Sequence, residues 1–186
     1  MVTAERERLT RPRRLRLLFQ DEARFGRISE LYRCWAPPGS RPACPQQLVR
    51  EAVYVFAAVS PSDGRLVAAI EPKADTATMS RFLELTAHAF PDERLIMVLD
   101  GAGWHVAKAL AVPDHLRLVR QPPYSPELNP VERLWLALRQ QYFANRMFAT
   151  LGAVTDQLKM ATEELAANPG TVRSLTLFPW IELCVL

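Results

Sequence analysis

A proline-rich turn that runs into an acid-bearing helix constrains this chain more than any other feature. The segment spans residues 122–135 and reads PPYSPELNPVERLW. Asn129 is a favourable cap and Pro130 suits a first helical position, so we expect a helix to start here. Glu132 then lies in its first turn. Pro122, Pro123 and Pro126 predict a fixed turn that aims this glutamate.

Two aspartates follow apolar runs elsewhere in the chain. Asp21 comes directly after residues 15–20, and Asp100 comes directly after the continuous apolar run 95–99. We expect both runs to be strands, which places Asp21, Asp100 and Glu132 at the ends of two strands and the start of one helix. Three carboxylates from separate elements suit Mg²⁺, which prefers oxygen ligands. Two such ions can activate an attacking oxygen and stabilise a leaving one in phosphodiester chemistry.

Each acid also has a simpler interpretation when it is taken alone. A polar residue after an apolar strand often just begins a loop, which would account for Asp21 and Asp100. Glu132 lies three residues after Asn129, the position at which a glutamate closes a capping box. The residue pattern alone leaves these alternatives open.

Composition bounds the class of protein. The 186 residues are 49% hydrophobic and 23% charged, and the net charge is +3. No run of 18 apolar residues and no secretory signal are visible, so we expect a cytoplasmic protein with no membrane partner. Residues 1–16 hold six Arg and two Glu, which predicts a solvated basic tail over residues 1–13 or a phosphate contact. The three cysteines have no metal-binding spacing and are expected to be reduced, structural thiols.

The periodicity predicts an α/β fold. Strands are expected at 15–19, 51–59, 65–70, 95–99 and 116–119, the first three as an antiparallel meander turning at residues 61–64. Helical spacing is expected at 76–90, 102–110, 130–142 and 151–165. Strands followed by alternating helices and strands predict one domain over residues 14–186, a mixed sheet of about five strands with helices on both faces.

Three segments resemble DDE transposases, and more narrowly the mariner-type superfamily in its bacterial insertion-sequence branch. They are LLFQDEARFG (17–26), VLDGAGWH (98–105) and QPPYSPELNPVERLW (121–135), in the family's order. The resemblance covers roughly residues 14–165 and implies a ribonuclease H-like fold. It also implies that Asp21, Asp100 and Glu132 are the catalytic, metal-binding triad, using Mg²⁺ (or Mn²⁺), with two ions. The 31 residues between Asp100 and Glu132 are close to the family's spacing.

The resemblance implies DNA partners, namely element ends and target DNA, and a dimer on DNA in the bacterial nucleoid. Gly101 departs from the family, which commonly has Asn there, and this weakens the expected orientation of the site. The N-terminal helix-turn-helix modules of such transposases are not expected within this sequence. We therefore expect a catalytic domain alone, with a separately encoded helix-turn-helix subunit as one possible partner.

Accessory roles are open for several further residues. Glu22 is expected to support the site or to be solvated, His105 to contact phosphate or a carboxylate or to be structural, and Trp104 to pack in the core or stack near the site. Tyr124 is a further accessory candidate in the proline-rich turn. His88 and His115 are expected at the surface. The candidates for lining a DNA path are Arg24, Arg120, Arg133 and Arg139.

Two other functions remain as alternatives to a transposase. One is a catalytically silent DNA-binding or assembly remnant, which would bind DNA or self-associate without cutting it. The other is a ribonuclease H-like nuclease not involved in transposition, which would cut an RNA–DNA hybrid or branched DNA.

Overall fold

The computed structural model describes residues 14–183, which are built around one five-stranded sheet of order β3-β2-β1-β4-β5. Strands β1 (Leu15–Ile28), β2 (Leu48–Ser60) and β3 (Arg65–Glu71) form an antiparallel meander, as predicted. Strands β4 (Arg94–Leu99) and β5 (Leu116–Arg120) continue the sheet in parallel with β1. The predicted mixed sheet is therefore confirmed.

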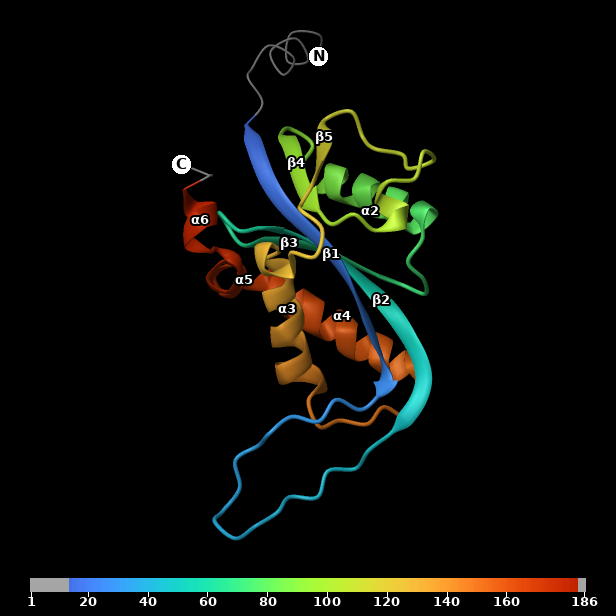
Figure 1. Cartoon of the computed structure of the whole chain (residues 1–186), viewed down its shortest axis with the longest axis vertical. Helices are drawn as coiled ribbons and strands as arrows, with labels where there is room; N and C mark the ends of the chain where they lie inside the picture. Colours follow the sequence, from blue (N-terminus) through green and yellow to red (C-terminus); the bar gives the residue numbers. More distant parts are fainter. Residues whose placement is uncertain (1–13, 184–186) are drawn as a thin grey trace.

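Helices cover both faces of the sheet (Figure 1). Helix α2 (Thr76–Ala89) packs on one face, while α3 (Val131–Leu138), α4 (Leu151–Ala167), α5 (Pro169–Thr176) and α6 (Pro179–Glu182) pack on the other. Strand β2 serves both layers, because Val55 and Ala57 face the α3–α4 side and Phe56 and Ala58 face α2. This alternation follows from the two-residue period of a strand.

Strand β1 is much longer than predicted, and this corrects the expected place of Asp21. The strand continues to Ile28 because it stays paired with β2, so Asp21 lies within it and not at its end. Its other neighbour, β4, pairs only from Leu15 to Phe19. Asp21 therefore lies just beyond the parallel pairing, on a strand that one neighbour continues to hold.

Three further elements differ from the prediction. Residues 102–110 contain only a short 3₁₀ turn, Gly103–His105, in place of the expected helix. Helix α4 ends before Asn168-Pro169-Gly170 as expected, but α5 starts at that same proline and α6 follows. Helix α3 runs on into a π-helical turn, Arg139–Phe143. No apolar run in this part of the sequence was long enough to predict α5 and α6.

A long loop, residues 29–47, extends away from the sheet between β1 and β2 (Figure 1). Its base is fastened by Asn145, whose side chain bonds the backbone N–H and C=O of Tyr32 at 3.0 and 3.1 Å. Cys34 in this loop is exposed, which is at odds with a structural thiol, and Cys44 is half-buried; both are free. Cys184 lies outside the described residues.

Arg16 corrects the expectation for the N-terminal arginines. Its side chain is only 5% exposed and pairs with Asp63 and Glu93 at 2.6 and 2.8 Å. It is therefore a structural cation that joins the β2–β3 turn to the start of β4. The predicted basic tail at residues 1–13 lies outside the described residues. No helix within residues 14–183 combines the length and apolar character needed to cross a membrane.

Candidate functional site

The three predicted acids line one cavity of about 730 Å³. Asp21 comes from the middle of β1, Asp100 from the residue after β4, and Glu132 from the first turn of α3. The proline-rich segment 121–126 forms much of the remaining wall, and the other lining residues are Gly101, Ala102, Arg120 and Asn129. The structure thus brings together all three carboxylates that the sequence singled out.

Sheet register explains why Asp21 and Asp100 approach one another. Phe19 on β1 lies opposite Val98 on the parallel strand β4, and this is their last pair. Continuing the same register by two residues places Asp21 beside Asp100, with neighbouring strands about 4.8 Å apart. The cavity opens where β4 ends, at the carboxyl ends of parallel strands, a usual position for ligand sites.

Asn129 fastens the start of α3 to β1. Its buried side chain donates to the Gln20 carbonyl at 3.0 Å and accepts the Val131 N–H at 3.2 Å. The anchoring point is the residue directly before Asp21, so this amide sets the helix start against the strand. The helix begins at Val131, one residue later than predicted.

The capping-box interpretation of Glu132 is not what the structure shows. The Asn129 backbone N–H, which a capping-box glutamate would accept, donates to the Pro126 carbonyl at 2.9 Å. Glu132 is exposed and lines the cavity instead.

The surroundings of Asp21 disfavour the ionised form of its carboxyl group. Burial raises its pKa to about 7, with the negative charges of Glu132 and Glu22 adding to the effect, although the Trp135 indole N–H opposes it by donating to Oδ2 at 2.8 Å. Glu132 is exposed as a residue, but partial desolvation of its carboxylate and the charge of Asp100 raise its pKa, against the opposing charge of Arg139. The acids are close enough to repel one another, and a bound cation would relieve that repulsion.

Trp135 is a site residue that the sequence pattern did not reveal, because its large apolar ring fits the helical spacing predicted at 130–142 without any further role. It is 4% exposed and reaches Asp21 from one helical turn beyond Glu132. The spacing could have revealed it, because residues three apart on a helix share a face.

His105 lies between two acids. Of the roles expected for it, contact with a carboxylate is the one that its position in the structure supports. Its Nδ1 lies 2.7 Å from Asp100 Oδ1, and its Nε2 lies 3.3 Å from Glu22 Oε2. The ring is 1% exposed. Burial alone would lower the pKa of His105, but Glu22 and Asp100 outweigh it and raise that pKa above its ordinary value.

Glu22 and Trp104 complete this cluster. The Glu22 side chain is 9% exposed, so the solvated alternative is wrong. It accepts the Trp104 indole N–H at 2.9 Å and the Gln20 amide at 3.1 Å. Trp104 also packs against the apolar core on the α2 side, so it has a core role and a polar contact together.

The remaining candidates differ in their exposure, and among them only Tyr124 and Arg120 line the cavity. Tyr124 is fully exposed with a φ of 57°, and Arg120 lines the cavity and is exposed. Arg24 and Arg133 are exposed. Arg139 is half-buried, pairs with Glu30 and lies over the Phe25 ring, so its charge is already engaged. His88 is exposed and His115 is half-buried.

The donor set fits a hard divalent cation, because it consists of carboxylate oxygens. Within residues 14–183, no three His, Cys, Asp or Glu side chains are already arranged to hold a metal ion. The acids therefore share a cavity without converging on a finished coordination sphere.

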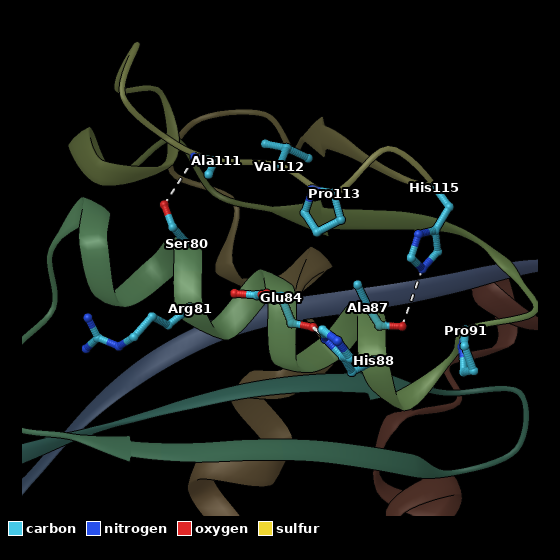
Figure 2. A pocket seen from close by; sticks show the side chains of 10 residues that line it. All are labelled: Ser80, Arg81, Glu84, Ala87, His88, Pro91, Ala111, Val112, Pro113 and His115. Carbon is cyan, nitrogen blue, oxygen red and sulfur yellow. Dashed lines mark hydrogen bonds between the residues drawn. The ribbon is translucent and has the colours of Figure 1, made fainter.

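A second cavity, of about 590 Å³, lies between α2 and the loop that leads to β5 (Figure 2). Figure 2 shows Ser80 bonded to the Ala111 backbone and His115 bonded to the Ala87 carbonyl, so these polar groups tie the loop to the helix. None of the three acids lines this cavity. The chemistry therefore points to the acid-lined cavity.

Comparison with known proteins gives a family match over most of the chain. Residues 16–155 match the family described as DDE superfamily endonuclease, a range that includes all three segments carrying the resemblance. The uncharacterized protein y4pE/y4sA of Sinorhizobium fredii (strain NBRC 101917 / NGR234) is 35% identical over 128 residues, covering 68% of this chain and 95% of its own length. The DDE part of the resemblance predicted from those segments is confirmed.

Solved structures of Mos1 transposase share the fold. The pre-cleavage Mos1 transpososome matches with a TM-score of 0.60 at 16% identity, over 91% of this chain and 55% of that one. The Mos1 mariner paired end complex with Mn matches at 0.59 and 16%, over 91% and 54%. The chain thus spans about half the length of these Mos1 chains. The likeness confirms the predicted ribonuclease H-like fold.

Proposed function

Because this chain belongs to the DDE superfamily endonuclease family, we propose that it is a transposase catalytic domain in which Asp21, Asp100 and Glu132 are the catalytic acids. The observation that carries the proposal is the shared cavity, where one acid arrives from β1, one from the end of β4 and one from α3. The reaction would be DNA strand cleavage followed by strand transfer. Both are in-line phosphoryl transfers.

Asp21, Asp100 and Glu132 would hold Mg²⁺, with Mn²⁺ as a substitute and two ions in the complete site. Such ions activate the attacking oxygen and stabilise the leaving oxygen. The oxygen donors and the mutual repulsion of the acids support this choice. Since the acids do not converge on a finished site, DNA phosphate oxygens would supply the missing ligands.

DNA is the proposed substrate, comprising element ends and target. Arg24, Arg120 and Arg133 are exposed, and Arg120 lies in the wall of the cavity, where it would contact a phosphate next to the scissile one. Arg139 would act indirectly, because Glu30 already pairs with its guanidinium. Binding should weaken steeply with salt, since phosphate contacts release counterions.

A dimer on DNA is the proposed assembly, in the bacterial nucleoid. The support is the likeness to Mos1 paired-end complexes, which are similar over about half of the Mos1 chain. Recognition of the element ends would come from a helix-turn-helix module, with a separately encoded subunit as one source. Co-purification and mass measurement on DNA would test both points.

The deciding experiment combines a crystal soaked in Mn²⁺ with a nicking assay on supercoiled plasmid. Anomalous density should lie between Asp21 and Asp100 within reach of Glu132. Asp100→Asn should abolish Mn²⁺-dependent nicking, while its melting temperature stays that of the wild type. Asp114→Asn is the matched control, because Asp114 is an exposed aspartate outside the cavity lining.

Retained nicking by Asp100→Asn would refute the assignment of the acids. Salt-sensitive DNA binding without nicking in Mn²⁺ would favour the silent DNA-binding or assembly remnant. Cleavage of an RNA–DNA hybrid or branched DNA, with no strand transfer, would favour a ribonuclease H-like nuclease.

A further inference from the structure

Each aspartate of the site has one carboxylate oxygen held by a buried N–H group. Asp21 Oδ2 accepts the Trp135 indole N–H at 2.8 Å. Asp100 Oδ1 accepts the Ala102 backbone N–H at 2.9 Å and lies 2.7 Å from His105 Nδ1. On Asp100 both contacts fall on the same oxygen, so the carboxylate is fixed in rotation with Oδ2 turned away from them.

The groups that hold these oxygens are themselves rigid. The Trp135 ring is 4% exposed and meets the Phe25 ring edge-on, with centroids 6.2 Å apart. An indole N–H is a donor only, so this ring can serve Asp21 in one way. Its helix also carries Glu132 three residues earlier, which couples the two acids through one rigid element.

His105 is fixed by its own backbone and by Glu22, on the side of the ring that does not face Asp100. Its backbone N–H bonds the Ala102 carbonyl at 2.9 Å within the 3₁₀ turn, and its Nε2 faces Glu22 Oε2 at 3.3 Å. Glu22 is fixed in turn by the Trp104 indole at 2.9 Å. His105 Nε2 is buried and has no well-aligned hydrogen-bond partner among the described residues, although Glu22 Oε2 lies close to it.

We propose that Trp135 and His105 are positioning residues that each occupy one oxygen of Asp21 and Asp100, so that each aspartate offers its other oxygen to a divalent cation. Glu22 and Trp104 support His105 in this role. The inference rests on the proposed function. Beyond that function, it states how these side chains orient the two aspartates before DNA binds.

The physical reason is the geometry that Mg²⁺ requires. Mg²⁺ demands near-ideal octahedral ligands at about 2.1 Å and is usually bound through one or two carboxylates, whereas Ca²⁺ also accepts bidentate ones. A carboxylate with one oxygen held by an N–H is disfavoured as a bidentate ligand. It presents only its other oxygen to the cation, in a fixed direction. Removing such outer partners in metal sites typically costs about 10- to 100-fold in metal affinity or activity.

Trp135→Phe and His105→Ala test the proposal, with His105→Asn as a rescue. Phenylalanine keeps an aromatic ring at position 135, although a smaller one, and removes the indole N–H. Asparagine places an amide N–H near the position of His105 Nδ1, whereas alanine removes it. Trp180→Phe is the matched control, because Trp180 is 39% exposed, packs edge-on against Phe19 and does not line the acid-lined cavity.

The measurements are Mn²⁺ affinity by calorimetry, nicking of supercoiled plasmid as a function of Mn²⁺, and thermal unfolding in EDTA. Trp135→Phe and His105→Ala should raise the Mn²⁺ dissociation constant about 10-fold or more. Nicking should return when Mn²⁺ is raised, with KM for DNA unchanged. His105→Asn should lie closer to the wild type than His105→Ala, and Trp180→Phe should match the wild type.

Wild-type Mn²⁺ affinity in Trp135→Phe and His105→Ala would overturn this inference while leaving the proposed function standing. A loss of nicking that Mn²⁺ does not restore, or an equal loss with Asn and Ala at position 105, would overturn it too. If the wild type neither binds Mn²⁺ nor nicks plasmid, the proposed function fails and the inference falls with it.

Discussion

Replacing Arg16 with methionine should destabilise the fold by about 2–4 kcal/mol at neutral pH. Arg16 donates to both carboxylate oxygens of Glu93 at 2.8 and 2.9 Å, to Asp63 at 2.6 Å and to Ser60 at 2.7 Å. Its guanidinium also lies 4.5 Å from the centre of the Phe90 ring. One side chain therefore ties together the start of β1, the β2–β3 turn and the segment before β4.

The magnitude follows from what the substitution leaves behind. Removing one partner of a fully buried ion pair costs about 3–5 kcal/mol, because the other charge stays buried without compensation. Here Glu93 is 18% exposed and Asp63 is 35% exposed, so water can partly solvate both carboxylates after the change. We therefore place the expected loss somewhat below that range, at about 2–4 kcal/mol, which corresponds to a fall in melting temperature of about 4–16 °C for a chain of this size.

The effect should depend on pH in a defined direction. Burial alone would raise the pKa of Asp63, but the hydrogen bond and charge of Arg16 outweigh it and hold that pKa below its ordinary value. A group with a lowered folded-state pKa stabilises the fold above its ordinary pKa, about 4, and this contribution disappears as pH falls through the lowered value. The gap between wild type and Arg16→Met should therefore be widest near neutral pH and shrink in acid.

Urea unfolding followed by circular dichroism at pH 7 and at pH 3 would measure both effects. Arg94→Met is the matched control, because Arg94 is an exposed arginine at the start of β4. A loss below about 1 kcal/mol at pH 7, the size expected of a surface pair, would refute the reasoning. An equal loss at both pH values would show that carboxylate ionisation is not the source.

Three further substitutions separate stability from activity. Gly64→Ala should cost more than about 2 kcal/mol in urea unfolding, because Gly64 has a φ of +71° and an added Cβ would lie 1.8 Å from the Pro169 carbonyl oxygen. Gly103→Ala, which meets no atom within 4 Å, should stay within about 0.5 kcal/mol, and similar losses for both glycines would contradict this account. Glu132→Gln should abolish Mn²⁺-dependent nicking of plasmid with a melting temperature within about 2 °C of the wild type, because Glu132 is exposed; a large drop in melting temperature would mean a structural role instead.

Local patterns were sufficient for most of the elements. The β-branched and aromatic run of β2, the turn at Gly64 and the apolar spacing of α2 and α4 are short-range signals, and the structure confirms each. The prediction of a helix at residues 102–110 was wrong because a mixture of small and apolar residues allows a helix but does not require one. The proline-rich segment 122–135 was informative because proline and the cap fix backbone geometry locally.

The extent of β1 was decided by its neighbours. Charged residues at 21, 22 and 24 suggested that the apolar strand had ended, yet β2 continues to supply hydrogen bonds as far as Ile28. Whether a strand continues depends on the strand beside it, which no local window contains.

The sequence by itself singled out the three candidate acids, their order and the type of element that carries each, because these follow from periodicity, turn chemistry and a family resemblance along the chain. Tertiary structure alone decided which side chains hold those acids. Trp135 is 114 positions from Asp21, and the Trp104 indole reaches Glu22 across 82 positions. Contacts of this kind depend on sheet register and helix placement, so they exist only after the chain has folded.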